Sequence, residues 1–264
     1  MRLGRGVRST GLSLCLAVLC ALTVSCATTD KRAEEQNRLR RAQSHLDIGI
    51  GYLENGRSAL ALREFMNAAE LDPRNARIQH ALGEAYLMRG KPEESEIHLK
   101  RALELYPDLH DARLSLTGLY LIQERYEDAI VHCDLLLDDP TFPAPYSALA
   151  NRGFAELKLG RRDQARRSLE LARDYSPKYW PALLSLAILE EREGHRADAV
   201  ALLHDVLDLA PGPRVESEVN YRLAEIYIAL GKRERALGHL SVAVSREPEG
   251  PWAKKSQDYL KLLR

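Results

Sequence analysis

Residues 48–73 read IGIGYLENGRSALALREFMNAAELDP, and residues 82–107 read LGEAYLMRGKPEESEIHLKRALELYP. The two stretches align without a gap, and a period of about 34 residues decides the architecture before any single motif does. The matching positions are Ile48, Gly49, Tyr52, Gly56, Ala61, Phe65, Ala68 and Pro73 in the first stretch, and Leu82, Gly83, Tyr86, Gly90, Ser95, Leu99, Ala102 and Pro107 in the second. The chain is therefore expected to be built from a repeated unit.

Four more units continue this register along the chain. The six units are expected at residues 42–75, 76–109, 110–143, 146–179, 180–213 and 217–250. The joints before the fourth and sixth units are longer than the others, because DDPTFPAPY (138–146) and APGPRVESE (210–218) widen the spacing there. Each joint is interpreted either as a plain surface loop or as a bend or contact point.

The residue types within a unit have physical reasons. Small residues such as Gly49 and Ala61 allow two antiparallel helices to approach closely, and glycines such as Gly56 end the first helix. Larger apolar residues fill the space between units, and each buried Leu or Phe contributes roughly 1.5–3 kcal/mol, so the stacking of neighbours supplies the stability. The third unit departs most from the pattern, because it lacks both glycines and has Leu136 where alanine is usual.

This pattern resembles the tetratricopeptide repeat. The resemblance implies an all-α fold, a right-handed α-solenoid of six repeats. After the last unit, residues 251–264 place Trp252, Tyr259, Leu260 and Leu263 at near-helical spacing, which predicts a C-terminal capping helix. Trp180 and Trp252 are expected to pack at unit boundaries rather than to stack on a ligand.

The N-terminal stretch has a different character from the repeats. Arg2, Arg5 and Arg8 precede an apolar run from Gly11 to Val24, which is the layout of a secretory signal. Fourteen helical residues reach roughly 21 Å, whereas the hydrocarbon core of a bilayer is about 30 Å thick. Export, and not a permanent span, is the interpretation.

The stretch from Leu22 to Cys26 resembles the lipobox of bacterial lipoproteins, although Thr23 stands where that family usually has leucine. The resemblance implies that residues 1–25 are a signal peptide and that Cys26 carries a covalent lipid such as palmitate, with no other cofactor. Residues 26–41 would then be a polar tether, and Ala27 favours the outer membrane, facing the periplasm. The alternative is ordinary cleavage near this site, which releases a soluble periplasmic protein.

Charge and cysteine content exclude some partners. The full chain has 38 basic and 38 acidic residues, and loss of the three signal arginines leaves a formal charge of about −3. The chain has no polybasic segment, so a nucleic-acid partner is not expected, since binding to phosphates needs concentrated Lys and Arg. Only Cys26 and Cys133 remain after the signal, which is no disulfide framework.

Repeats of this family act through a concave wall built by places 2, 5, 9 and 12 of each unit. Here these places predict a largely apolar wall suited to an apolar helix face or a β-prone segment of a protein partner. Lys and Asn, which clamp a C-terminal carboxylate in some relatives, are missing from them. The alternative is that these side chains simply cover one another. The predicted wall residues are Leu46, Ile50, Leu53, Leu87, Leu114, Leu121, Phe154, Leu157, Leu184, Ile188, Tyr221 and Ile228.

No motif of a catalytic, nucleotide or metal site occurs, so we expect no enzyme, no metal and no small-molecule substrate. His98, His132 and His239 share one place of their units and are interpreted as a solvated face rather than as metal ligands. The run His132-Cys133-Asp134 is interpreted as helical neighbours that point in different directions, with Cys133 in the core.

Signal, tether and six repeats together resemble the pilotin family of type IV pilus systems, and LDIGIGYLENGRSALALREF (46–65) is the most telling stretch. The resemblance implies an outer-membrane lipoprotein that binds secretin subunits and helps them to assemble as a multimeric pore. The alternative is a general scaffold lipoprotein in envelope or cell-wall assembly.

Overall fold

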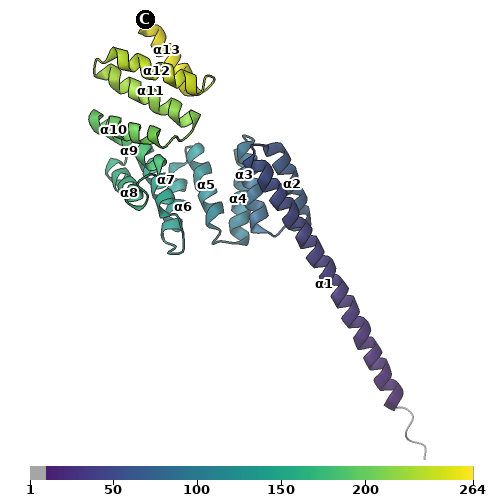
Figure 1. The fold of residues 1–264 in the computed structure, drawn as a ribbon. Coiled ribbons are helices and arrows are strands. Elements are labelled where there is room, and N and C mark those ends of the chain that lie inside the picture. Colours follow the sequence, from purple (N-terminus) through teal and green to yellow (C-terminus); the bar gives the residue numbers. More distant parts are fainter. Residues whose placement is uncertain (1–9, 264) are drawn as a thin grey trace, which may run out of the picture. The chain divides into compact units, whose positions relative to one another are not determined.

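The computed structural model describes the backbone of residues 10–263 and the side chains of residues 31–263 (Figure 1). Within that range it contains thirteen α-helices and no β-strand. The helices are α1 (Thr10–Glu54), α2 (Ser58–Leu71), α3 (Ala76–Met88), α4 (Pro92–Leu105), α5 (His110–Ile122), α6 (Tyr126–Leu137), α7 (Pro145–Lys158), α8 (Arg162–Tyr175), α9 (Trp180–Glu193), α10 (Arg196–Asp208), α11 (Pro213–Ala229), α12 (Arg233–Arg246) and α13 (Pro251–Leu262).

The chain divides into two compact units, Met1–Ala112 and Arg113–Arg264, and the boundary falls inside α5. Within each unit, helices pack mainly against the next ones along the chain, such as α1 on α2 and α3 on α4 in the first unit, and α7 on α8 and α11 on α12 in the second. Packing between sequence neighbours is what defines a solenoid. The predicted all-α solenoid of helical hairpins is confirmed.

The segment before the repeats is helical where the structure describes it fully. α1 runs without a break through residues 31–41, whose side chains are all exposed, and the first buried residue is Ala42. Straight-chain charged residues have good helix propensity, and Arg38 pairs with Glu35 at 2.6 Å, so this part of the tether is a helix of roughly 17 Å rather than extended chain. The side chains of the predicted signal peptide (1–25) and of Cys26 lie outside what the structure describes.

Among the residues that the structure describes, none of the helices combines the length and the apolar character needed to cross a membrane.

Each hairpin depends on a close approach between its two helices. A Cβ atom on Gly49 would lie 2.3 Å from the ring of Phe65, and one on Gly83 would lie 2.6 Å from Leu99. Real Cβ atoms do not tolerate such distances, so the glycine allows the large side chain of the second helix to lie against the backbone of the first. Phe65 and Leu99 are both fully buried as a result.

The third repeat keeps the same contact with other residues. Thr117 and Cys133 occupy the places that glycine and a large apolar residue fill elsewhere, and both are fully buried. A larger side chain in α5 thus faces a smaller one in α6. The sequence departure in this repeat therefore follows the same packing constraint, which needs a small residue on one side only.

The longer joint between α6 and α7 is not a plain surface loop. Phe142 is only 8% exposed and packs in a cluster with Cys133, Leu136 and Ala148. Asp139 fixes the turn, since its Oδ1 accepts hydrogen bonds from the backbone N–H of Thr141 (2.8 Å) and from its hydroxyl (2.7 Å). The extra residues therefore anchor the end of α6 to the start of α7.

The predicted capping helix is confirmed as α13, which packs on α11 and α12. Trp252, Tyr259, Leu260 and Leu263 lie against the core of the second unit. The ring of Tyr221 in α11 lies 5.3 Å from Trp252 and 5.9 Å from Tyr259, measured between centroids. The last helix therefore covers apolar surface that α11 would otherwise leave to water.

Two glycines of α1 test the packing constraint with a matched pair. Gly49→Ala brings a methyl group against Phe65 and is expected to lower the free energy of unfolding by about 1–3 kcal/mol. Gly51 lies in the same helix, and a Cβ atom there would meet nothing within 4 Å, so Gly51→Ala should raise it by about 0.4–1 kcal/mol. Urea unfolding followed by circular dichroism measures both, and equal effects would contradict the proposed contact.

A partly buried ion-pair network joins α8 and α9. Arg166 donates to Glu190 and to Glu193, both at 2.6 Å, and His195 Nδ1 lies 2.7 Å from the other oxygen of Glu190. Glu190 is only 8% exposed. The hydrogen bond from Arg166 is the main reason why the pKa of Glu190 lies below its ordinary value, and burial opposes that shift.

This network predicts an acid-dependent loss of stability. The pKa of Glu190 is lower in the folded chain than in the unfolded chain, where it is about 4.3. The contribution of Glu190 to the free energy of unfolding is therefore fully present above the unfolded pKa, and it is lost as the pH falls through the folded pKa. Glu190→Gln should therefore be less stable than the parent chain by about 1.5–3 kcal/mol at pH 7, and the difference should narrow below pH 4. Glu104→Gln is the control, since its pair with Arg101 is exposed and worth less than about 1 kcal/mol.

Candidate functional site

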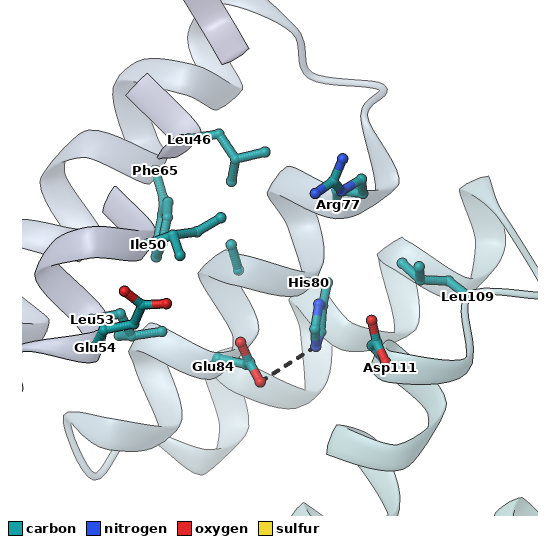
Figure 2. A pocket seen from close by; sticks show the side chains of 11 residues that line it. Leu46, Ile50, Leu53, Glu54, Phe65, Arg77, His80, Glu84, Leu109 and Asp111 are labelled. Atoms are coloured by element: carbon teal, nitrogen blue, oxygen red, sulfur yellow. Dashed lines mark ion pairs between the residues drawn. The ribbon is translucent and has the colours of Figure 1, made fainter. Parts of the chain in front are cut away.

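Two cavities lie at places where the first helices of neighbouring repeats come together, one in each unit. The first cavity has a volume of about 320 Å³ and is shown in Figure 2. It is lined by Leu46, Ile50, Leu53, Glu54, Phe65, Arg77, His80, Ala81, Glu84, Leu109 and Asp111. All of these residues belong to the first unit.

The first cavity has an apolar side and a polar side. The apolar side is formed by α1, which contributes Leu46, Ile50 and Leu53. Figure 2 shows these side chains across from His80 and Glu84 of α3. The His80 Nε2 atom lies 3.5 Å from Glu84 Oε1. Three carboxylates and one arginine line this cavity, which gives it a formal charge of −2 when His80 is counted as neutral.

The second cavity, of about 390 Å³, lies wholly in the second unit. Its size is at the lower end of the range for ligand pockets, about 300–1,000 Å³, so it has room for a few side chains. It is lined by Leu121, Ala150, Asn151, Phe154, Leu157, Lys158, Trp180, Pro181, Leu184, Ser185, Ile188, Arg192, Glu218, Arg222 and Trp252.

Cations surround the apolar floor of the second cavity. Lys158 Nζ lies 5.2 Å from the centre of the Phe154 ring, and Arg192 donates a hydrogen bond of 3.1 Å to the carbonyl oxygen of Leu157. Arg222 lies over Trp252 and pairs with Glu218 at 2.8 Å. Three cations and one carboxylate line this cavity, which gives it a formal charge of +2.

The predicted wall residues divide into three groups. Leu46, Ile50 and Leu53 line the first cavity. Leu121, Phe154, Leu157, Leu184 and Ile188 line the second cavity. Leu87, Leu114, Tyr221 and Ile228 line neither of the two cavities.

Neighbouring side chains pack against two of the four residues that line neither cavity. Tyr221 is 7% exposed because Trp252 and Tyr259 lie against it, and Leu114 packs against the cluster around Cys133. Even within the cavities, Leu46 and Leu157 are 1% exposed and form the floor rather than a free surface. The interpretation that these side chains cover one another is therefore right for several of the predicted residues.

The sequence analysis did not predict the charged side chains that line the two cavities, although these residues occupy recurrent places of the repeat. His80 and Glu84 occupy the same two places of the second repeat that Leu46 and Ile50 occupy in the first. Lys158 and Arg192 likewise share one place, in the fourth and fifth repeats. The expectation of a largely apolar wall is therefore incomplete. Both cavities combine an apolar floor with charges, and the charges have opposite net sign in the two.

Two of the three histidines that share one place, His98 and His239, do not form a solvated face, contrary to the sequence interpretation. His98 Nδ1 lies 2.8 Å from Gln79 Oε1 and its ring stacks on Tyr86, while His239 Nδ1 lies 2.9 Å from Asn220 Oδ1 and stacks on Tyr227. Burial lowers the pKa of both histidines. They bridge the two helices of their hairpins.

Cys133 has a structural environment. The thiol is fully buried, and burial raises its pKa to about 12, so it stays protonated near neutral pH and is not a nucleophile.

In the described part of the chain, Glu190, His195 and Asp198 have possible ligand atoms within 4.8 Å of one another. Arg166 already binds Glu190 there, so an ion-pair network accounts for this cluster.

These helical hairpins, stacked with small residues at their closest approach, define an α-solenoid repeat protein. Models of the tetratricopeptide repeat match residues 46–110, 151–213 and 191–255, which together are more than half of the chain. The chain belongs to the tetratricopeptide-repeat family.

The chain is similar to tetratricopeptide-repeat proteins from different cellular systems. Anaphase-promoting complex subunit 7 of Arabidopsis thaliana is 26% identical over 78% of this chain and 36% of its own length. The type IV pilus assembly protein PilF of Pseudomonas aeruginosa is 26% identical over 54% of each chain. The crystal structure of PilW, a type IV pilus biogenesis factor, superposes with a TM-score of 0.70 at 20% identity and covers 81% of this chain and 97% of PilW.

A solved structure of Pseudomonas aeruginosa PilF shows the same fold, with a TM-score of 0.66 at 20% identity over 84% of this chain and 99% of PilF. The chain spans between about a third and just over half of the length of the anaphase-promoting complex subunit and of the PilF sequence named above.

Proposed function

We propose that this chain is a lipid-anchored, non-enzymatic assembly factor of the bacterial outer membrane, a pilotin that binds secretin subunits of a type IV pilus. The observation that carries the proposal is the combination of a basic and apolar N-terminal stretch that ends at Cys26 with repeats whose cavities have apolar floors. Cys26 would supply the anchor, and the cavities would hold segments of an unassembled partner. The only covalent group involved would be the lipid.

The chemistry of the cavities supports a polypeptide as the ligand. Neither cavity contains a nucleophile next to a base, and the one fully described cysteine is buried and protonated. Apolar floors with charged rims are suited to segments that would otherwise expose apolar side chains to water. Sequence similarity to PilF, named as a type IV pilus assembly protein, points to the pilus as the assembly concerned.

The free energy of burying acyl chains in a membrane supports the proposed lipid anchor. Each buried CH₂ of an acyl chain contributes about 0.8 kcal/mol, so one chain anchors marginally while two or three hold a protein at a membrane effectively for good. A helper that captures aggregation-prone subunits near the membrane benefits from such an anchor, because the repeats then remain close to the place of assembly.

A general scaffold lipoprotein of the cell envelope is the second candidate. The similarity to a subunit of the anaphase-promoting complex favours it, since this match covers more of the chain than the match to PilF does at the same identity. In that case the repeats would organise other proteins without any contact to a secretin.

Deletion of the gene tests the proposal directly. Unheated envelope samples from the deletion strain should lack secretin multimers on gel electrophoresis while secretin monomers remain, and the intact gene on a plasmid should restore the multimers. Normal multimers in the deletion strain would contradict the pilotin function and favour the general scaffold.

A substitution tests the anchor separately. Cys26→Ala should abolish labelling by a radioactive fatty acid and move the chain from the membrane fraction to the soluble fraction, because no acyl chain is left to bury. Cys133→Ala is the matched control, since the Cys133 thiol is fully buried and its loss should leave the labelling unchanged. Unchanged membrane retention of Cys26→Ala would contradict lipidation.

A further inference from the structure

We infer that the cavity of the second unit binds a segment of a partner protein that places carboxylates beside apolar side chains. This inference rests on the proposed function only in assuming a polypeptide ligand. Its basis is the separation of charge and apolar surface within the cavity, and it assigns a charge to the partner segment that the repeat family as a whole does not specify.

The apolar floor comes from three elements of the second unit. Phe154 lies in α7, Trp180 and Leu184 lie in α9, and Trp252 lies in α13. The part of this surface that water still reaches includes the partly exposed rings of Phe154 and both tryptophans. Aromatic rings of this kind supply large contact area with little loss of side-chain freedom, which is why they carry much of the affinity in protein interfaces.

Two cations of the rim are available to a ligand. Lys158 and Arg192 are exposed, and within the described residues neither forms an ion pair with a carboxylate. Arg192 is held toward the cavity by its hydrogen bond to Leu157, and Lys158 lies over Phe154. Arg222 differs, because Glu218 and Glu191 already neutralise it. A carboxylate of the ligand would meet Lys158 and Arg192 at the edge of the apolar floor.

The opposite charge of the first cavity sharpens this inference. Glu54, Glu84 and Asp111 give that cavity a net negative rim, so an acidic segment would be repelled there. The same chain therefore offers two cavities of opposite sign, and an acidic apolar segment is expected to select the one in the second unit.

The two tryptophans make this cavity visible in solution. The chain contains two tryptophans in total, Trp180 and Trp252, and both line the second cavity. Intrinsic tryptophan fluorescence of the full chain therefore reports on occupation of this cavity and not of the first.

The probe is the synthetic peptide acetyl-Gly-Glu-Leu-Phe-Glu-Leu-Gly-amide, compared with analogues that carry Gln or Lys in place of both Glu residues. At low ionic strength the Glu peptide should shift the tryptophan emission with a Kd at least tenfold lower than that of the Gln peptide. Tenfold corresponds to about 1.4 kcal/mol. The Lys peptide should bind most weakly, and added salt should reduce the preference.

Paired variants assign the preference to the rim. The double variant Lys158→Gln and Arg192→Gln should bind the Glu and Gln peptides equally, and it should fold normally because both side chains are exposed. The matched control is Lys178→Gln with Arg162→Gln, two exposed cations that do not line the cavity, and it should keep the preference. Leu53→Asp in the first cavity should also keep it.

Equal affinity of the three peptides for the unmodified chain, or an acidic preference that survives in the Lys158 and Arg192 variant, would overturn the inference. Failure of the proposed function gives a different result. If secretin multimers form without the gene while the peptide preference holds, the pilotin function is wrong and the assignment of this cavity stands.

Discussion

The close approach of the two helices in each hairpin is the constraint on which the structure depends. At the contact between Gly49 and Phe65 there is no room for a methyl group, and the same holds between Gly83 and Leu99. Because a large side chain of the second helix lies directly on the backbone of the first, each hairpin presents its remaining apolar residues to its neighbours. Stacking can then bury apolar side chains between repeats that would be unstable alone.

Polar contacts reinforce this geometry in a regular way. Hydrogen bonds between residues 19 apart in sequence recur in the hairpins: His45 with Glu64, Gln79 with His98, and Asn220 with His239. Each joins the first helix to the second and satisfies partly buried polar atoms that would otherwise be costly. His98 and His239, which share one place of their repeats, are therefore part of the hairpin itself.

The cavities arise from the same stacking. Where the first helices of neighbouring repeats meet, their side chains cover one another only in part, and the uncovered remainder becomes a floor with a charged rim. The two rims have formal charges of −2 and +2 although the whole chain is neutral. A scaffold with two such cavities can discriminate between segments by charge while it uses similar apolar floors for affinity.

The sequence by itself determined the repeat period, the helical hairpins, the small residues at the close contacts and the capping helix, because these depend on local spacing and on residue size. It also contained the positions of both cavities in its register. Only the tertiary structure decided which of those positions line a cavity. Tyr221 and Leu114 share the register of Leu46 and Leu184, yet they line neither cavity. Trp252 lies against Tyr221 and Leu114 packs on the cluster around Cys133, and such contacts join elements that are apart in sequence. The same reason explains Phe142, whose place in a loop predicts exposure and whose packing against Cys133 and Leu136 buries it.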